Sequence, residues 1–313
     1  MSVNMKNAGL ILIILVCMLF ISGCQGGGLT NRNVNEDYRT GTEGVIIDFV
    51  DNAPPSKIYA GDPMEVVVEL NNKGAYPDTD SFVGKLEIYG FENAAINGEW
   101  DRGNTISPSL KGRSQYNREG GYATMTYRDR DGVRVPFNQD SYKTEIVVAS
   151  CYKYKTIANP SVCIDPDPYK LVQEKKACEV KDQSLGSQGA PVAVDRIEQE
   201  IGADKIYFRI FVKNKGSGSV VIPDRYNSCP FDIGHEDINK VIVRAKLSHD
   251  ASPSCTPQGT ASEPLRLVNG EGMMFCTFSM PGSDSAYQSP LNIELDYVYS
   301  DSISKSIEIV NLK

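Results

Sequence analysis

The chain has 313 residues, of which 41% are hydrophobic and 23% are charged, and its formal net charge is -8. This is the composition of a globular protein, and the length allows two cores of about 100–150 residues each. The negative charge argues against binding to the phosphate backbone of a nucleic acid, and it disfavours attachment to anionic lipid headgroups by charge alone.

The first 23 residues have the pattern of a signal peptide. Residues 1–7 are polar and contain Lys6, and residues 8–21 form one uncharged apolar run of fourteen residues. A helix that spans a membrane needs about 20 such residues, so this run has the length of a signal-peptide core. Because residues 1–23 carry one lysine and no acidic residue, their removal would change the net charge from -8 to -9.

The apolar run ends in Ile21, Ser22, Gly23 and Cys24. This order resembles the lipobox of bacterial lipoprotein signal peptides. The resemblance implies that diacylglycerol is attached to the Cys24 thiol, and that cleavage makes Cys24 the first residue of the mature chain. Such a lipid would hold the protein on the extracytoplasmic face of the cell membrane, because each buried methylene contributes about 0.8 kcal/mol. An uncleaved membrane anchor and an ordinary secreted protein remain open as alternatives.

Residues 24–43 are rich in Gly, Asn and Thr and contain few large apolar side chains. A segment of this composition buries too little apolar surface to fold by itself. It therefore predicts a flexible tether that holds the first domain away from the membrane.

The body of the chain contains a weak internal repeat. Residues 45–76 and 192–221 each contain a short apolar stretch, a polar turn and a longer apolar stretch that ends in Asn-Lys-Gly. Later in each copy, over residues 146–154 and 291–299, side chains alternate, and both stretches end in Tyr-x-Tyr. A repeat of this size indicates two copies of one structural unit.

Alternation with a period of two is typical of half-buried antiparallel strands. Further strands are expected at residues 83–89, 122–127, 240–247, 264–268 and 273–280. Many short strands separated by Gly, Pro, Asn and Asp predict an all-β chain built of sandwiches. We expect two tandem antiparallel β-sandwich domains at residues 44–165 and 190–313, and a connector at residues 166–189 whose middle, 175–181, could add an edge strand.

The Asn-Lys-Gly segments and the strands before them resemble the Ig-like modules of prokaryotic surface proteins, of the CARDB or NEW3 type. Those modules begin a β-sandwich with a strand that ends in an Asn-x-Gly turn. The resemblance covers about thirty residues in each copy, together with the late strand. It implies tandem Ig-like sandwiches in a cell-surface setting, and it carries over no catalytic residue.

Six cysteines follow the N-terminal segment: Cys151, Cys163, Cys178, Cys229, Cys255 and Cys276. An even number of cysteines in a secreted chain indicates disulfide bonds. Three of the six lie at or before the connector and three lie after it. If all six are bridged, an odd number of bridges must join the two groups.

The pairing itself has fifteen possible solutions. We prefer Cys255–Cys276 between neighbouring strands, Cys151–Cys163 across a hairpin, and Cys178–Cys229 between the connector and the second domain. The alternative pairs Cys163 with Cys178 and leaves Cys151 to another partner.

Motifs for catalysis and for metal binding are absent from the sequence. It has no C-x-x-C, G-x-S-x-G, P-loop or dinucleotide fingerprint, and His235 and His249 have no paired ligand spacing. Acidic clusters at residues 78–80, 129–132 and 165–167 could offer oxygen ligands to calcium, but solvated turns explain them better. We therefore predict no metal, no cofactor and no enzymatic activity.

Trp100 is the only tryptophan, and it lies at residues 97–103 in a loop by composition. Exposed aromatic side chains stack on sugar rings or anchor protein interfaces. Trp100 and Tyr116 are therefore the candidate ligand-binding residues. The alternative is that Trp100 is a core residue that closes one end of a sandwich.

The leading hypothesis is a non-catalytic binding or adhesion module that is held in the membrane by its N-terminal lipid. Its ligand would be a protein or a glycan that the sequence does not identify, and not a nucleic acid. One alternative is an accessory subunit of an envelope, pilus or secretion assembly. Another is an extracellular carbohydrate-active enzyme, because a pair of catalytic carboxylates is defined by distance in space and leaves no sequence spacing.

Overall fold

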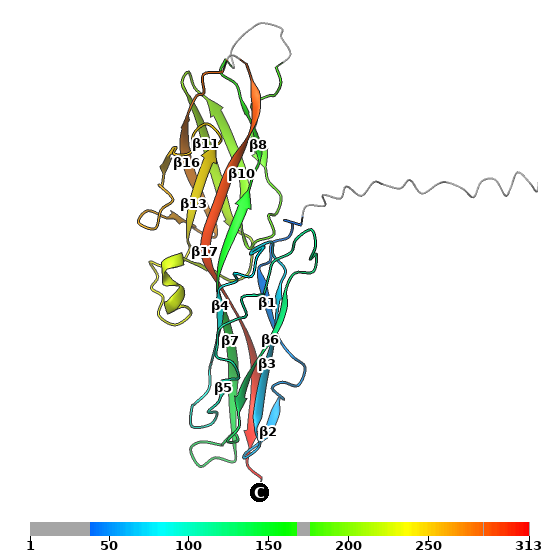
Figure 1. Cartoon of the computed structure of the whole chain (residues 1–313). Coiled ribbons are helices and arrows are strands. Elements are labelled where there is room, and N and C mark those ends of the chain that lie inside the picture. The colour runs from blue at the N-terminus through cyan, green and yellow to red at the C-terminus, as the bar shows by residue number, and fades with distance from the viewer. Residues whose placement is uncertain (1–37, 168–175, 284, 313) are drawn as a thin grey trace, which may run out of the picture. The chain divides into compact units, whose positions relative to one another are not determined.

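The computed structural model describes residues 38–167, 176–283 and 285–312. The lipidation expected at Cys24, the signal peptide and most of the tether lie outside these residues. The described part of the chain is nearly all β, with one short 3₁₀ helix, and its sheets are antiparallel apart from one pair of strands (Figure 1). The predicted all-β fold with antiparallel sheets is confirmed.

The strands of the first repeat and the connector are β1 (Val45–Phe49), β2 (Lys57–Tyr59), β3 (Met64–Asn72), β4 (Gly84–Tyr89), β5 (Glu99–Trp100), β6 (Tyr122–Asp129), β7 (Ser141–Ala158), β8 (Ser161–Ile164) and β9 (Gln183–Ser184). The elements that follow are β10 (Val192–Ile201), β11 (Lys205–Asn214), β12 (Ser219–Val221), the 3₁₀ helix η2 (Pro223–Ser228), β13 (Lys240–Leu247), β14 (Ser254–Thr256), β15 (Leu265–Arg266), β16 (Glu271–Ser279) and β17 (Tyr287–Val310). The strands expected from alternation all form, with ends that shift by a few residues.

Alternation of side chains explains the two layers of each sandwich. In β3, Met64, Val66, Val68 and Leu70 are buried, and the residues between them are exposed or half-buried. Because side chains of a strand point alternately to its two faces, one face of β3 meets the core and the other meets solvent. The second repeat follows the same rule, with buried Ile206, Phe208, Ile210 and Val212 along β11.

Three sheets arise from this pattern. The sheet β1-β3-β6-β5 defines what we name the first lobe, and the sheet β14-β16-β11-β10-β9 defines the second lobe. The third sheet, β15-β13-β17-β7-β4, supplies the facing layer of both lobes (Figure 1). It does so because β7 and β17 are long enough to run through both.

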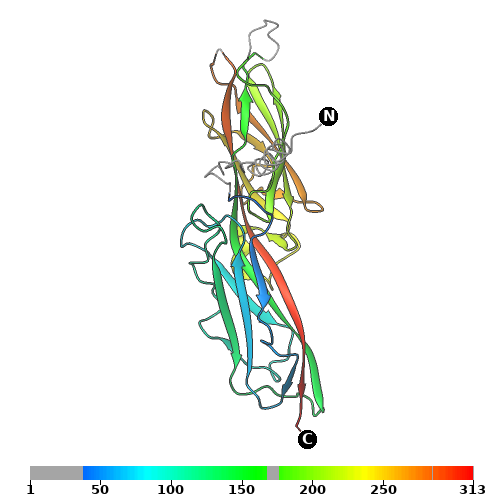
Figure 2. The ribbon, with the colours of Figure 1, turned by 90° about the vertical axis from the view of Figure 1, so that its right-hand side faces the viewer.

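Strands β7 and β17 pair over their whole common length, from Ser141↔Val310 to Ala158↔Ile293, and they lie side by side in both views of the ribbon (Figures 1 and 2). The last part of β17 also pairs in parallel with β2. Residues expected in the second sandwich thus complete a sheet of the first. The domain boundaries themselves stay a prediction.

The internal repeat has a close structural counterpart. Val45 pairs with Asn72 at the start of the first copy, and Val192 pairs with Asn214 at the start of the second. The backbone N–H of Val45 donates to the Tyr152 hydroxyl at 3.0 Å, and that of Val192 donates to the Tyr297 hydroxyl at 3.4 Å. The two Tyr-x-Tyr segments meet each other across the β7–β17 pair, as Tyr152↔Tyr299 and Tyr154↔Tyr297.

These four tyrosines are buried where the two lobes join. Burial raises the pKa of Tyr152, Tyr154 and Tyr297 well above the usual value, and it raises the pKa of Tyr299 to about 12. Their hydroxyls all contact backbone groups, so the cluster is both packed and hydrogen-bonded.

The structure pairs the six cysteines as Cys151–Cys229, Cys163–Cys178 and Cys255–Cys276. The preferred Cys255–Cys276 is confirmed, as is the odd number of bridges between the two groups. Cys151–Cys163 is wrong because β8 pairs with β17 and does not fold back on β7. Cys178–Cys229 is wrong because Cys229 follows η2, which packs against β7, and there it reaches Cys151. The alternative pair Cys163–Cys178 is the one that forms.

The connector adds its edge strand later than expected. β9 pairs with β10 through Ser184↔Arg196 and Gln183↔Ile197, whereas residues 175–181 were the expected edge strand. The Asp182 carboxylate accepts a hydrogen bond from the backbone N–H of Gln199, which fixes the chain just before β9.

Candidate functional site

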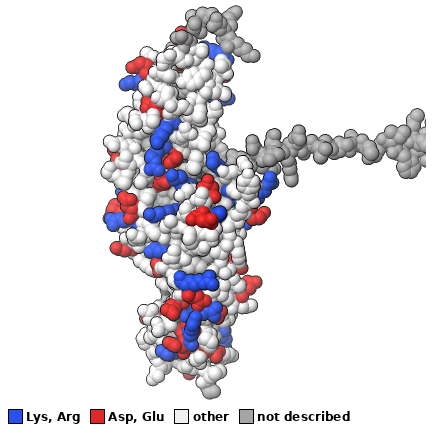
Figure 3. Space-filling view, in the orientation of Figure 1, with Lys and Arg blue, Asp and Glu red and all other residues white. Residues whose placement is uncertain are grey.

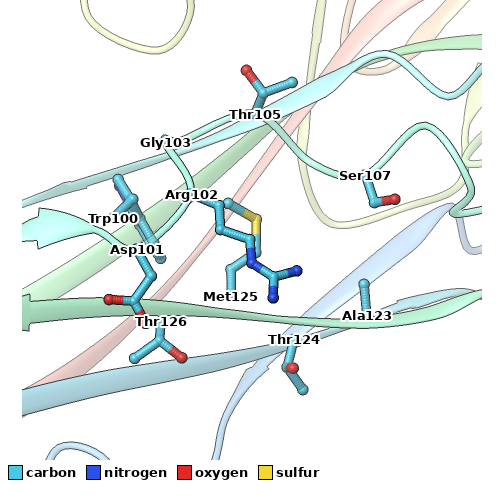
Figure 4. Close-up of a pocket in the computed structure, with 10 residues that line it drawn as sticks. All are labelled: Trp100, Asp101, Arg102, Gly103, Thr105, Ser107, Ala123, Thr124, Met125 and Thr126. Atoms are coloured by element: carbon cyan, nitrogen blue, oxygen red, sulfur yellow. The ribbon is translucent and has the colours of Figure 1, made fainter.

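A pocket of about 410 Å³ opens at one edge of the first lobe, between β6 and the chain segment that follows β5. Its lining residues are Trp100, Asp101, Arg102, Gly103, Thr105, Ser107, Ala123, Thr124, Met125 and Thr126 (Figure 4). It contains the predicted Trp100, and we take it as the candidate functional site.

The pocket exists because β5 ends after two residues. β5 lies against β6 at Glu99↔Arg128 and Trp100↔Tyr127. A Cβ on the preceding Gly98 would lie 2.4 Å from the carbonyl oxygen of Arg128, so only glycine permits this approach. After Trp100 the chain turns at Gly103, whose φ of 74° favours glycine.

Beyond this turn the chain crosses to the other sheet. There the backbone N–H of Leu86 donates to Asn104, and the N–H of Ile106 donates to Gly84. Residues 104–106 therefore border β4 and no longer border β6. The crossing leaves a slot with β6 on one side and residues 105–107 on the other (Figure 4).

The edge of β6 that faces the slot has unpaired backbone groups. The carbonyl oxygen of Thr126 accepts a hydrogen bond of 2.9 Å from the N–H of Asp101, so Thr126 points its backbone to this edge. Residues two apart in a strand point their backbone groups to the same side, so Thr124 and Tyr122 do the same. In the described part of the chain, no strand pairs with Tyr122–Met125 on this side.

The inner wall of the slot is apolar. Ala123 and Met125 pack against the core and are only partly buried. Figure 4 shows the Met125 and Arg102 side chains between the two chain segments that border the slot. Hydroxyl groups of Thr105, Ser107 and Thr124 lie on exposed residues at its rim.

Trp100 is half-buried and closes one end of the slot. Its ring meets that of Tyr127 edge to face, with centroids 5.7 Å apart. It also lines a second hollow of about 550 Å³, together with Tyr89 and Phe91. Trp100 is therefore a packed residue with an accessible surface, placed in a short strand rather than in the expected loop. Tyr116 is 99% exposed and does not line this pocket.

Charges around the slot are largely paired. Arg128 Nε donates to Asp101 at 2.7 Å, and this hydrogen bond lowers the pKa of the Asp101 carboxyl. Arg128 also pairs with Glu65. Arg102, by contrast, is exposed and has no ion-pair partner among the described residues. On the face drawn in Figure 3, acidic and basic side chains are interspersed.

The three acidic clusters are occupied by the protein's own groups. The Asp129 carboxylate accepts hydrogen bonds from the backbone of Asn97, Asp131 and Gly132. Lys176 pairs with Asp165 at 2.6 Å, and Lys111 pairs with Asp80 at 3.0 Å. No group of three or more potential metal ligands occurs in the residues that the structure describes.

Sequence reasoning found Trp100 but missed Arg102, Thr124 and Met125. The signal for them is weak and local: two glycines, Gly98 and Gly103, bracket a two-residue strand. The slot forms where no strand among the described residues pairs with the outer edge of β6, and this depends on pairing between segments that are distant in the sequence.

Neither protein-family models nor curated proteins provide a match to this chain. Among its described residues, the chain has no helix that is both long enough and apolar enough to cross a membrane.

Proposed function

We propose that the chain is a membrane-anchored extracytoplasmic lipoprotein that acts as a non-catalytic binding or adhesion module. The observation that carries the proposal is that all six cysteines of the described residues form disulfides. Disulfides persist in oxidising compartments outside the cytoplasm, which supports export of the chain. The lipobox-like segment that ends in Cys24 supports lipid attachment as the mode of anchoring.

The fold supports binding rather than turnover. Two sandwiches that share β7 and β17, with the Cys151–Cys229 bridge between them, form a frame that presents strand edges and loops.

The anchor is tested by expressing the wild-type chain and the Cys24→Ser variant in bacteria, followed by cell fractionation. We expect the wild type to be membrane-bound, to be released by protease from intact cells, and to carry diacylglycerol at Cys24 by mass spectrometry. The Cys24→Ser variant should be released into the medium, and its continued firm attachment to the membrane once the hydrophobic segment has been removed would contradict the proposal.

A second candidate is an accessory subunit of an envelope, pilus or secretion assembly. The open edge of β6 favours it, because envelope assemblies can join their subunits by adding a strand to an exposed sheet edge. Crosslinking in cells distinguishes the two: a subunit gives one stoichiometric partner band, and a free adhesion module does not.

A further inference from the structure

We propose that the slot beside β6 binds an extended segment of a partner polypeptide, which adds to the sheet as a strand next to Tyr122–Met125. The inference rests on the binding function proposed above, and it names the partner class and the site. It follows from the backbone groups on this edge, from a comparison with the second lobe, and from the lining of the slot.

The backbone edge selects the class of ligand. Thr124, which lines the slot, and Tyr122 next to it point N–H and C=O groups to this edge, and β5 has already ended where they lie. Another polypeptide backbone at strand spacing satisfies such alternating donors and acceptors. The available edge, Tyr122–Met125, accommodates about four residues, or roughly 13 Å of extended chain.

The second lobe shows the same place with a more closely packed wall, although β14 pairs with β16 only over Phe275–Thr277. Asn72 at the end of β3 is equivalent to Asn214 at the end of β11. Four residues earlier in each strand, Val68 pairs with Met125 of β6, and Ile210 pairs with Met274 of β16. Met125 and Met274 are therefore equivalent as well. Met274 is fully buried, whereas Met125 is only partly buried.

The burial of Met274 has a visible cause. Next to it, a Cβ on Gly272 would lie 2.7 Å from the carbonyl oxygen of Arg266, so β15 approaches β16 closely there. The buried side chains of Leu265 and Leu267 complete this wall. In the first lobe, Ala123 takes the place of Gly272, and the segment opposite it contains the exposed Ser107 and Pro108. The first lobe has the corresponding segment, with Ile106 buried, but its Ser107 and Pro108 are exposed, so Met125 is less completely covered than Met274.

The residues that line the slot predict which side chains the ligand should have. A strand beside β6 would point every second side chain toward Ala123 and Met125, and these positions favour small or apolar residues. The Arg102 side chain lies between the two segments that border the slot (Figure 4), has no ion-pair partner among the described residues, and favours an acidic residue on the ligand. The proposed ligand is an extended segment with alternate apolar side chains and a carboxylate that reaches Arg102.

The experiment uses the full-length chain, purified in detergent, and a phage library of random peptides of about twelve residues, long enough to exceed the edge. Peptides are selected on the wild type and counter-selected on Thr124→Pro. Proline removes the N–H that faces the slot and leaves the pairing of β6 with β3, which uses the other residues of the strand. Trp100 is the only tryptophan, so its fluorescence reports binding at the site.

We expect selected peptides to bind the wild type and Thr124→Ala equally, and to bind Thr124→Pro at least about tenfold more weakly. The Arg102→Ala substitution should weaken the binding of acidic peptides and leave the binding of other peptides unchanged. N-methylation of alternate peptide amides should abolish binding to the wild-type protein. Because this test changes only the peptide, it remains valid if the Thr124→Pro variant fails to fold.

The proposal would be overturned if peptides bound the wild type and Thr124→Pro equally, or if no peptide were selected. It would also be overturned if peptides still bound whichever set of alternate amides was N-methylated. A dimer of the purified chain that Thr124→Pro dissociates would assign the slot to a second copy, and Trp100 quenching by a glycan panel would assign it to a sugar; either result overturns it too. Because anchoring is measured in cells and peptide binding on purified protein, the two proposals fail separately.

Discussion

In the second lobe, β10 is flanked by β9 and β16 is flanked by the three residues of β14, whereas in the first lobe the described residues place no strand beyond β1 and the two residues of β5 beyond β6. The flanking strands of the second lobe are held by disulfides: β14 contains Cys255, bonded to Cys276 of β16, and β9 follows the Cys163–Cys178 bridge. The sequence has no cysteine between Cys24 and Cys151, so the first lobe has no such staple.

This difference indicates that the repeated sequence pattern determines the core of each lobe. The segments that are not repeated determine which sheet edges are covered. Exposed strand edges promote association with other chains, and proteins usually protect them. Two copies of one unit can therefore serve two purposes, with the protected lobe acting as a frame and the open lobe as a binding surface. The following predictions test how far the two lobes are alike and where they differ.

The largest effect is expected from alkaline pH, because the tyrosines that join the lobes are buried. An unfolded tyrosine ionises near pH 10, whereas burial holds the pKa of Tyr299 at about 12 and the pKa of Tyr152 and Tyr297 well above the usual value. A raised folded pKa contributes stability that is complete below pH 10 and is lost as the pH rises through the folded value. We expect cooperative unfolding of both lobes above pH 10, followed by circular dichroism and by tyrosinate absorbance.

Equivalent variants sharpen this experiment. Tyr152→Phe and Tyr297→Phe each remove one buried ionisable group and should each move the unfolding midpoint to higher pH. Ionisation of all tyrosines near pH 10 with both lobes still folded would show that the cluster is open to water.

A smaller and unequal effect is expected at the two equivalent methionines. Met274→Ala removes a fully buried side chain and should lower the free energy of unfolding by about 2–5 kcal/mol. Met125→Ala should cost less than half as much, because its side chain already faces an open slot and leaves no closed cavity. Urea denaturation of both variants measures the difference. Equal losses would mean that the slot is closed in solution.

Local alternation predicts much of the core but little of the edges. The period-two pattern of Met64–Leu70 and the shared Tyr-x-Tyr segments predict strands and buried faces, since these depend on neighbouring residues. Cys255–Cys276 was also within reach, because the two residues lie on strands close in sequence. Cys151 pairs with Cys229, 78 residues away, and no local pattern specifies such a partner.

The candidate site was predictable only in part for the same reason. Trp100 attracts attention as the sole tryptophan, and its position beside an open edge depends on where β5 stops. Met125 looks like any inward residue of a strand, and only comparison with Met274 shows that it is less completely covered. Sheet edges are the part of a β fold that the sequence specifies through non-local contacts.

The smallest effect concerns the turn that the two copies share. Asn72 Nδ2 donates to the carbonyl oxygens of Tyr76 and Leu110, at 2.9 and 3.1 Å, and its Oδ1 accepts from Gly74 N–H at 3.2 Å. Asn214 repeats two of these bonds, with Gly218 and Gly216 at 2.9 and 3.2 Å.

Replacement of these asparagines should show how closely the two turns match. Asn214→Ala should cost about 1 kcal/mol, and Asn72→Ala somewhat more, because Asn72 is fully buried and its loss leaves the Leu110 carbonyl without that donor. Asn→Asp variants keep the Oδ1 acceptor but replace the donor by a second acceptor, so at each site they should be at least as destabilising as alanine. A larger loss at Asn214 than at Asn72 would contradict the order of burial. Thermal unfolding of the four variants would measure these differences, and because the lobes share β7 and β17, each variant should shift one common transition rather than split it in two.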